Sequence, residues 1–419
     1  MPELTVSPEM VALNRGPLEI TIELRPFSIT VRRNGRRLLR NAGVWVAQGQ
    51  NKDHFVQYTE GVVAGELLDP SERATRAHVK RHPSHNGGPP QGVELALRLG
   101  DERHGTLLIE VPKDNEFAFK LTADPRPDGG EPLRLALDWD RRSIEHFVAL
   151  GIRHATEFDH RGRRVQLGAD RRYTGPDCPP EMLAEGGIPQ GDCAPTPFLE
   201  SSRGYAVLAE TNANGTIFDF SSDRTCVSTR HLAGPLSVRF FAGPSPAARL
   251  RQYCAATGFP ALLPEWAYGF WKSRDVHEDR EAVLDDFNGF REHNIPLDAI
   301  VIDSPWATQY NSWEFNPHQL PDAEQMVTMM RSYGVRTVLW CTPWVNLDSR
   351  DGQIPPQPES ERLHAEPAPN YEPGVAGNHF VRTAEGIPYV GQWWMGTGSL
   401  VDFTSPAAEE WWRPQVKGI

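Results

Sequence analysis

The sequence predicts an all-β first half, which we expect to be a β-sandwich, followed by an α/β region built on a parallel sheet. Before residue 244, apolar and polar residues alternate along many short segments, as in antiparallel strands with one face in water. After residue 244, apolar strands alternate with amphipathic helices, which indicates parallel strands joined by crossover helices. The 37 prolines and 36 glycines also suit a chain of many short strands and turns.

The strands of the first half follow from this period of two. Turn residues separate them, and the Asn34-Gly35 pair is the clearest, because a two-residue hairpin turn needs positive φ at both central positions. Many short strands without a long helix indicate a sandwich. The main expected strands cover residues 18–24, 27–33, 93–99, 106–111, 117–123 and 236–243.

The second half begins with a helix over residues 245–258, because Ser245 is a good N-cap and Pro246 suits the first turn. Three strand–helix units follow. A strand-like VDFT segment at 401–404 leads into a last helix after Ser405, which Pro414 should kink or end. The expected strands of the three units cover 268–274, 299–306 and 337–344, and the helices between them cover 278–294 and 323–334.

Polar and aromatic residues follow each of these three strands. Parallel strands bring their carboxyl ends to one edge, and barrel enzymes build their sites there. Asp303 is therefore a candidate site residue, although an aspartate that caps the next loop is the alternative. Indole rings stack on sugars and their N–H groups need partners, so tryptophans at strand ends indicate a sugar site. Seven of the 12 tryptophans lie between residues 270 and 395: Trp271, Trp306, Trp313, Trp340, Trp344, Trp393 and Trp394.

Composition excludes several other classes of protein. The net charge of −12 disfavours nucleic acid, and the short basic clusters at 32–40 and 161–164 are interpreted as solvated turns or strand faces. No apolar stretch approaches the roughly 20 residues that span a bilayer, so no membrane partner is expected. Five scattered cysteines without a CxxC pair predict neither a zinc site nor another metal site. No signal peptide is visible, so we expect a cytoplasmic protein. We also expect that the protein needs no cofactor.

Several segments, in order, resemble glycoside hydrolase family 31, the retaining α-glucosidases and α-xylosidases. LPEWAYGFWKSR (263–274), IPLDAIVIDSPW (295–306) and SYGVRTVLWCTPWV (332–345) are similar to the family's first three barrel strands. EFNPHQLPDAEQMV (314–327) resembles its loop and helix after strand two. TPFLESSRGYAVLAE (196–210) resembles the N-domain segment that runs into a Ser-Arg-Gly-Tyr turn. The resemblance covers most of the chain.

The resemblance implies an α/β plus all-β architecture. Residues 1–244 would form an N-terminal β-sandwich of galactose-mutarotase-like shape, and 245–261 a connecting helix and linker. Residues 262–419 would form the first part of a (β/α)8 TIM barrel with an insert at 346–398. The substrate would be an α-linked oligosaccharide or glycoside, and nothing in the sequence sets the oligomeric state.

The resemblance also assigns roles to residues. Asp303 would bind sugar hydroxyls in the −1 subsite, and Trp340 and Trp394 would line it. Arg274 stands where the α-glucosidase branch has an arginine, although a structural ion pair is equally consistent. The strand-end indoles Trp271 and Trp344 complete the candidate substrate-binding residues.

The catalytic carboxylates are not assigned. Retaining hydrolysis needs two carboxyl groups about 5–5.5 Å apart, and the family carries its nucleophile in a Lys-x-Asp-x-x-Glu type string that this sequence lacks. Asp298, Asp348 and Asp402 are poorly placed for the role. We expect the chain to stop before the nucleophile and to be inactive alone. DSPW (303–306) stands in place of the common Asp-x-Asp, and GIRH (151–154) stands in place of a Gly-x-Gly-Glu-Arg string. The resemblance therefore does not imply specificity for glucose.

Two other functions remain open on the sequence. One is a non-catalytic carbohydrate-binding protein that uses the sandwich and the tryptophan-rich half. The other is an aldose mutarotase, which would need a facing histidine and glutamate. His154 and Glu157 are available for it, at a spacing without clear meaning.

Overall fold

The computed structural model divides the chain into two compact units, Met1–Pro260 (unit 1) and Ala261–Ile419 (unit 2). None of the helices that it describes has the length and apolarity to cross a bilayer. Trp394, one of the predicted site residues, lies outside the described residues. The described residues are 2–51, 54–56, 61–63, 66–68, 72–82, 91–127, 129, 132–153, 158–167, 192–211, 215–231, 234–349, 366–393 and 395–418.

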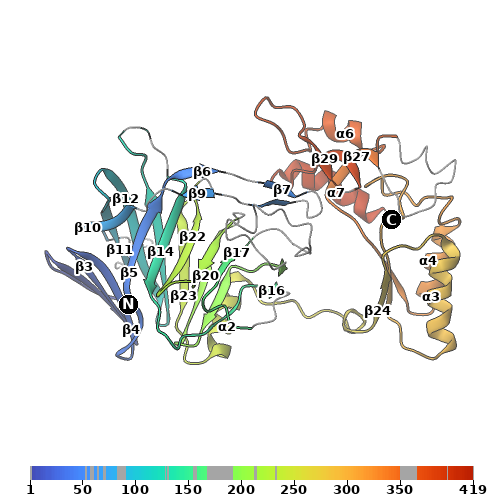
Figure 1. The fold of residues 1–419 in the computed structure, drawn as a ribbon. Coiled ribbons are helices and arrows are strands. Elements are labelled where there is room, and N and C mark those ends of the chain that lie inside the picture. Colours follow the sequence, from blue (N-terminus) through green and yellow to red (C-terminus); the bar gives the residue numbers. More distant parts are fainter. Residues whose placement is uncertain are drawn as a thin grey trace. The chain divides into compact units, whose positions relative to one another are not determined.

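Unit 1 is built mainly of antiparallel strands (Figure 1). Seventeen of them hydrogen-bond into one sheet, so a sandwich of two separate sheets stays a prediction. They are β1 (Glu3–Val6), β2 (Met10–Arg15), β3 (Leu18–Leu24), β4 (Phe27–Arg33), β5 (Arg36–Ala47), β10 (Glu72–Arg81), β11 (Gly92–Leu99), β12 (Arg103–Lys113), β13 (Glu116–Ala123), β14 (Arg134–Asp140), β15 (Phe147–Ala149), β17 (Arg164–Gln166), β19 (Phe198–Ser201), β20 (Tyr205–Ala209), β21 (Ile217–Asp219), β22 (Arg224–Arg230) and β23 (Leu236–Phe241). Three short pairs accompany them: β6 (Gly49–Asn51) with β9 (Glu66–Leu68), β7 (His54–Val56) with β8 (Gly61–Val63), and β16 (Ile152–Arg153) with β18 (Asp192–Cys193).

The sequence pattern explains these strands. The expected strands at 18–24 and 27–33 are confirmed to the residue as β3 and β4, because each alternates buried and more exposed side chains. Asn34 and Gly35 have φ of 48° and 73°, as the predicted hairpin turn requires. The buried side chains of the sheet gather in one large apolar core, in which the rings of Phe117 and Phe240 stack at 4.7 Å.

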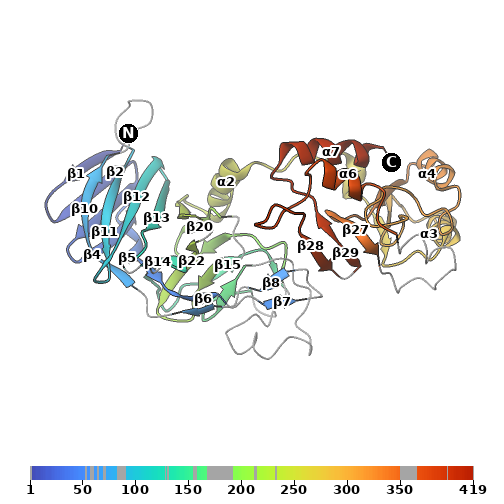
Figure 2. The same cartoon turned by 90° about the horizontal axis from the view of Figure 1, so that it is seen from above.

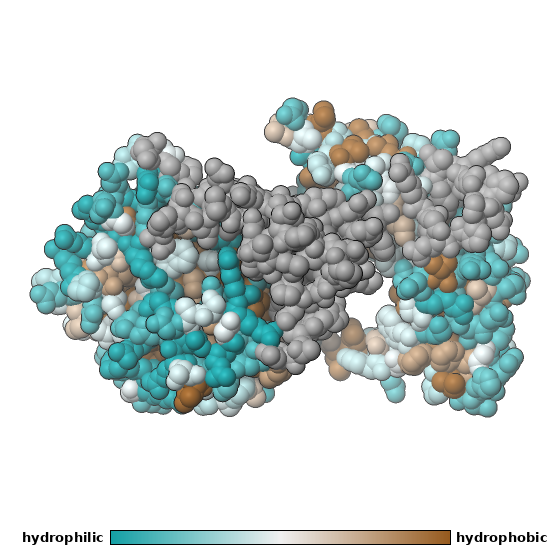
Figure 3. Space-filling view, in the orientation of Figure 1, coloured by the Kyte–Doolittle hydropathy of each residue, from teal (hydrophilic) through white to brown (hydrophobic). Residues whose placement is uncertain are grey.

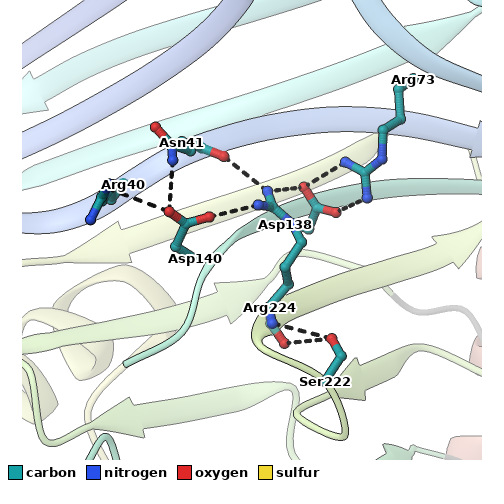
Figure 4. Close-up of polar contacts among 7 residues, drawn as sticks. All are labelled: Arg40, Asn41, Arg73, Asp138, Asp140, Ser222 and Arg224. Carbon is teal, nitrogen blue, oxygen red and sulfur yellow. Dashed lines mark hydrogen bonds and ion pairs between the residues drawn. The ribbon is translucent and has the colours of Figure 1, made fainter. Parts of the chain in front are cut away.

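Ion pairs reinforce the place where β5 meets β10 and β14. Asp138 of β14 is 2% exposed and accepts hydrogen bonds from Arg73 of β10 and Arg224 of β22, at 2.5 and 2.6 Å. Arg224 also donates to Asp140 at 2.7 Å, and Asn41 of β5 donates to the same carboxylate at 2.7 Å. Figure 4 shows these side chains converging from the four strands. The two carboxylates therefore link β5, β10, β14 and β22.

Helix α2 (Pro246–Thr257) closes unit 1. Ser245 caps it, since its Oγ accepts a hydrogen bond from the N–H of Ala248 at 3.2 Å. Arg249 of α2 forms an ion pair with Glu200 of β19, and the ring of Tyr253 lies 4.3 Å from that of Phe198. The helix thus packs on the strands that precede it.

Unit 2 begins with a three-stranded parallel sheet in the order β24 (Trp271–Arg274), β25 (Ala299–Ile302) and β26 (Arg336–Leu339). The short 3₁₀ helix η2 (Glu265–Tyr268) precedes it, and helices α3 (Arg280–Glu292) and α4 (Ala323–Ser332) connect its strands. We expected three buried strands, but only β25 is buried, because β24 and β26 each have one neighbour in the described sheet. Each outer strand leaves an edge that could pair with another strand.

A second, antiparallel sheet follows, which the sequence did not predict. It contains β27 (Trp344–Ser349), β29 (Gly396–Leu400) and β28 (Val390–Trp393), in that order. Figure 2 shows the three strands side by side, near α6 (Tyr371–Ala376) and α7 (Pro406–Lys417). The third expected strand of the parallel sheet therefore ends at Leu339, and Trp344 starts a strand of the other sheet.

Two further expectations near the end of the chain need correction. Val401 forms only an isolated bridge with Phe380, and turn residues follow it, so VDFT is not a strand. Helix α7 continues past Pro414 to Lys417, because the missing N–H removes only one hydrogen bond in the last turn.

The visible surfaces of the two units differ in character. The face of unit 1 seen in Figure 3 is mainly hydrophilic where it is coloured, whereas unit 2 also shows hydrophobic residues. Several large apolar side chains of unit 2 near the starts of its parallel strands are exposed, including Leu262 at 94% and Tyr268 at 64%. Such surface favours association with another apolar surface.

Candidate sugar-binding site

The carboxyl ends of β25 and β26 lie side by side in unit 2. The N–H of Trp340 donates to the carbonyl oxygen of Ile302 at 3.1 Å, so Asp303 and Trp340 directly follow paired residues. Both side chains are half-buried. The two candidate residues that the sequence placed at this edge are therefore brought together, while their role in binding stays a prediction.

The loop after β25 holds Asp303 by hydrogen bonds. Its Oδ1 accepts from the N–H of Ser304 at 2.7 Å, which is the bond of a loop-capping aspartate. The hydroxyl of Ser304 in turn hydrogen-bonds the hydroxyl of Tyr310. Trp306 donates from Nε1 to the carbonyl oxygen of Trp340 at 2.7 Å. These contacts fix the loop against the end of β26.

Four aromatic rings form a wall beside this edge. The planes of Trp340 and Trp393 are nearly parallel at 6.5 Å, and those of Trp344 and Trp393 at 6.1 Å. Tyr310 packs edge-on against Trp340 at 6.0 Å and Trp393 at 5.3 Å. We call these four residues the aromatic wall. Trp340 is its most exposed member, so its indole is the ring that a ligand could reach.

Trp393 is one of the tryptophans that indicated a sugar site but was not assigned a role in it, and Tyr310 was not predicted. Trp393 is 2% exposed, and its Nε1 donates to Asn346 Oδ1 at 2.8 Å. Along β28, Gly391 and Trp393 are buried while Val390 and Gln392 are exposed, so Trp393 lies on the covered face of the strand. Trp344, a predicted contact residue, is 8% exposed and packs against Trp393. It is therefore a buried member of the aromatic wall.

Arg274, at the carboxyl end of β24, is held by an acidic residue of α3. Its Nε donates to Asp286 Oδ2 at 2.8 Å. His277, which is fully buried, donates from Nε2 to the same oxygen at 3.1 Å, and Lys272 Nζ lies 3.5 Å away. Burial raises the pKa of Asp286, but the hydrogen bonds and the positive charges outweigh it and hold the pKa below its ordinary value. The structure therefore contains the ion pair that the sequence left as an alternative.

We expect Asp286→Asn to lower the free energy of unfolding of unit 2 by about 2 kcal/mol at neutral pH, because Arg274 and His277 lose the negative charge and one of the two acceptor oxygens of the carboxylate. A depressed carboxyl pKa contributes stability above the unfolded value of about 3.9 and loses it as the pH falls through the folded value. The acid branch of the stability profile should therefore be shallower in the variant. Urea unfolding across the acid range checks this, and an unchanged slope would contradict it.

Trp271 is not brought to this edge. It pairs with Ala299 at the start of β25, whereas Arg274 pairs with Ile302 at its end. Its ring stacks on Trp266 at 5.5 Å. Trp271 therefore lies at the amino end of the strand, and we leave it out of the proposed site.

Two of the remaining acids make local contacts. Asp298 precedes β25 and accepts a hydrogen bond from the N–H of Phe270 at 3.2 Å. Asp402 accepts from the N–H of Thr404 at 3.0 Å within its own turn. Both contacts suit structural carboxylates.

Residues 260–418 match the family model for the TIM-barrel domain of glycosyl hydrolases family 31. Neutral alpha-glucosidase AB of Mus musculus is 30% identical over 435 residues, which are 98% of this chain and 41% of that protein. The chain belongs to glycoside hydrolase family 31. The matched domain begins where unit 1 ends, so unit 2 is the part that carries the family 31 barrel sequence.

Other family 31 relatives match shorter parts of the chain. Alpha-glucosidase 2 of Bacillus thermoamyloliquefaciens is 30% identical over 203 residues, covering 48% of this chain and 23% of that protein. An alpha-xylosidase of Emericella nidulans is 28% identical over 229 residues, covering 53% and 27%. The chain spans less than half the length of these relatives.

Solved structures of the family share the fold. A sulfoquinovosidase of E. rectale, 15% identical, superposes with a TM-score of 0.65 over 99% of this chain and 56% of its own. An alpha-xylosidase from a soil metagenome, 16% identical, gives 0.54 over 99% and 55%. At these identities the likeness concerns the fold alone.

Proposed function

We propose that the chain supplies the sugar-binding edge of a retaining α-glycosidase that acts on α-linked glucosides or xylosides. The observation that carries the proposal is the pairing of Asp303 with Trp340 at the carboxyl edge of a family 31 barrel sequence. The half-buried indole of Trp340 would stack on the sugar, and the carboxylate of Asp303 beside it would accept hydrogen bonds from hydroxyls. The names of the relatives, alpha-glucosidase and alpha-xylosidase, support this substrate class.

We also propose that residues 1–419 alone bind the sugar without hydrolysing it. Retention needs a nucleophile and an acid/base, and the sequence contains no Lys-x-Asp-x-x-Glu string. Assays of the chain with aryl α-glucosides and α-xylosides should therefore give no turnover. Robust hydrolysis would refute this part of the proposal and leave the binding part intact.

Trp340→Ala is expected to weaken binding of glucose or xylose about tenfold, because a lost stacking contact is worth roughly 1.4 kcal/mol. Titration of tryptophan fluorescence measures the dissociation constant. Trp271→Ala removes an equally large ring from the opposite end of the same parallel sheet and serves as the matched control, with an expected effect within about twofold. A wild-type chain without saturable response, or equal losses in both variants, would contradict the proposal.

The missing catalytic string favours a second candidate, a non-catalytic carbohydrate-binding protein. A hydrolase subsite is complementary to a transition state in which positive charge develops on the sugar. It should therefore bind a cationic iminosugar more tightly than the neutral sugar. Equal affinity for both ligands would favour the binding protein.

A further inference from the structure

Unit 1 holds a buried guanidinium group that pairs with no carboxylate among the described residues. Arg203 lies in the turn between β19 and β20 and is 7% exposed. Its Nη2 donates to the carbonyl oxygen of Arg37 at 2.5 Å, and its Nε is buried without a hydrogen-bond partner. By contrast, the buried Arg103 and Arg249 are each paired with a glutamate. A buried charge without a counter-charge is unfavourable by several kcal/mol, so the surroundings of Arg203 favour an anion.

The contact with Arg37 places Arg203 against the hairpin of β4 and β5, which has an arginine at each of four positions around its turn. We call residues 32–37 the arginine hairpin. Arg32 stands directly opposite Arg37, and Arg33 directly opposite Arg36. Like charges in such positions repel each other. The positive φ angles of the two turn residues fix this register, so the pairs cannot move apart by slipping.

Acidic side chains do not balance the arginine hairpin. In the part of the chain that the structure describes, none of its arginines forms an ion pair, and Arg33 donates to the neutral side chain of Asn115 at 2.8 Å. Glu19 of β3 stands opposite Arg32, but the two form no ion pair. The whole chain carries a net charge of −12, so this surplus of positive charge is local.

We propose that the arginine hairpin and Arg203 form a site of unit 1 that binds an oxyanion, either free or carried by a larger molecule. The guanidinium group presents parallel N–H donors that match two oxygens of a sulfate, phosphate or carboxylate group. A bound oxyanion would supply both the missing counter-charge of Arg203 and the screening of the cross-strand pairs. The site lies in unit 1, which the matched barrel domain does not cover, so this proposal does not rest on the proposed sugar site.

Calorimetric titration of the 419-residue chain with sodium sulfate, at ionic strength held constant with sodium chloride, tests the site. We expect saturable binding by the wild type. The double variant R36Q/R37Q changes two exposed side chains and should weaken binding at least tenfold, since each lost charge-assisted hydrogen bond to the anion reduces the affinity and a tenfold loss corresponds to about 1.4 kcal/mol. R203K keeps the charge without the planar fork and should also bind more weakly.

The matched control is R76Q/R98Q, because these two arginines are also exposed and stand directly opposite each other on β10 and β11 of the same unit. It should bind sulfate within about twofold of the wild type. No saturable binding by the wild type, or equal binding by R36Q/R37Q and the wild type, would overturn the proposal. Equal losses in both double variants would also overturn it, by showing a general charge effect.

The same titration identifies the source of the oxyanion. Inorganic phosphate represents a free ion, and polygalacturonate represents carboxylates on a polysaccharide, with neutral dextran as its control. Tighter binding of polygalacturonate than of phosphate, lost in R36Q/R37Q, would assign the site to an anionic polysaccharide. Binding of the small ions without such a gain would assign it to a free oxyanion.

Discussion

Asp138→Ala is expected to lower the free energy of unfolding of unit 1 by about 3 kcal/mol, because removal of one partner leaves charges uncompensated in a buried network. Asp138 is 2% exposed, and two arginines converge on it (Figure 4). Arg73 and Arg224 are 48% and 26% exposed, so water can solvate them partly, and we place the loss at the lower end of the range for such changes. Hydrogen exchange of β14 and β22 in the full chain measures the loss within unit 1.

Arg40→Ala is the matched control for Asp138→Ala. Arg40 belongs to the same group of charges, but it is 61% exposed and lies 3.5 Å from Asp140. Exposed ion pairs contribute about 0–1 kcal/mol, so exchange in β14 should hardly change. If both variants accelerated exchange equally, burial of the carboxylate would not be the cause of its contribution.

The sequence predicted the strands of unit 1 well where alternation was strong. Residues 18–24 and 27–33 were predicted without error, since their buried face contains only large apolar side chains. Helix α3 begins after Asp279, two residues into the predicted range, because the side chain of Asp279 caps the N–H of Ala282. Local chemistry was sufficient in these cases.

The antiparallel sheet of unit 2 could not be read in the same way. Strand β29 has the sequence GTGSL, and Gly398 leaves no room for a Cβ, which would lie 2.2 Å from the carbonyl oxygen of Val345. Glycine was selected here by close approach of two backbones, and it removes the apolar alternation that marks a strand.

The candidate site also has one feature that the sequence predicted and others that it could not predict. The adjacency of Asp303 and Trp340 follows from a rule about parallel strand ends, so sequence was sufficient. The pairing of Arg274 with Asp286 depends on how α3 packs on β24, which no local pattern encodes. Trp271 looked like a strand-end residue, but the strand begins rather than ends there. Tertiary packing therefore decided which strand-end residues could meet.

A large loss of stability is also expected in the aromatic wall, because its packing depends on one buried ring. The ring of Trp393 stacks on those of Trp340 and Trp344, and its side chain is almost fully buried. We expect Trp393→Ala to lower the free energy of unfolding of unit 2 by about 3–5 kcal/mol, through lost apolar burial and the cavity left behind. Asn346 would also lose the N–H that its side-chain oxygen accepts.

Two variants separate the contributions to this loss. Trp393→Phe keeps a ring but removes the N–H and part of the volume, so about 1–2 kcal/mol should be lost. Tyr389→Ala removes a ring that is 45% exposed just before β28, and we expect a change within about 0.5 kcal/mol. Urea unfolding followed by tryptophan fluorescence measures all three. Equal destabilisation by Trp393→Ala and Tyr389→Ala would show that the stacked rings do not stabilise the aromatic wall. Another contact would then have to position the indole of Trp340 for binding a sugar.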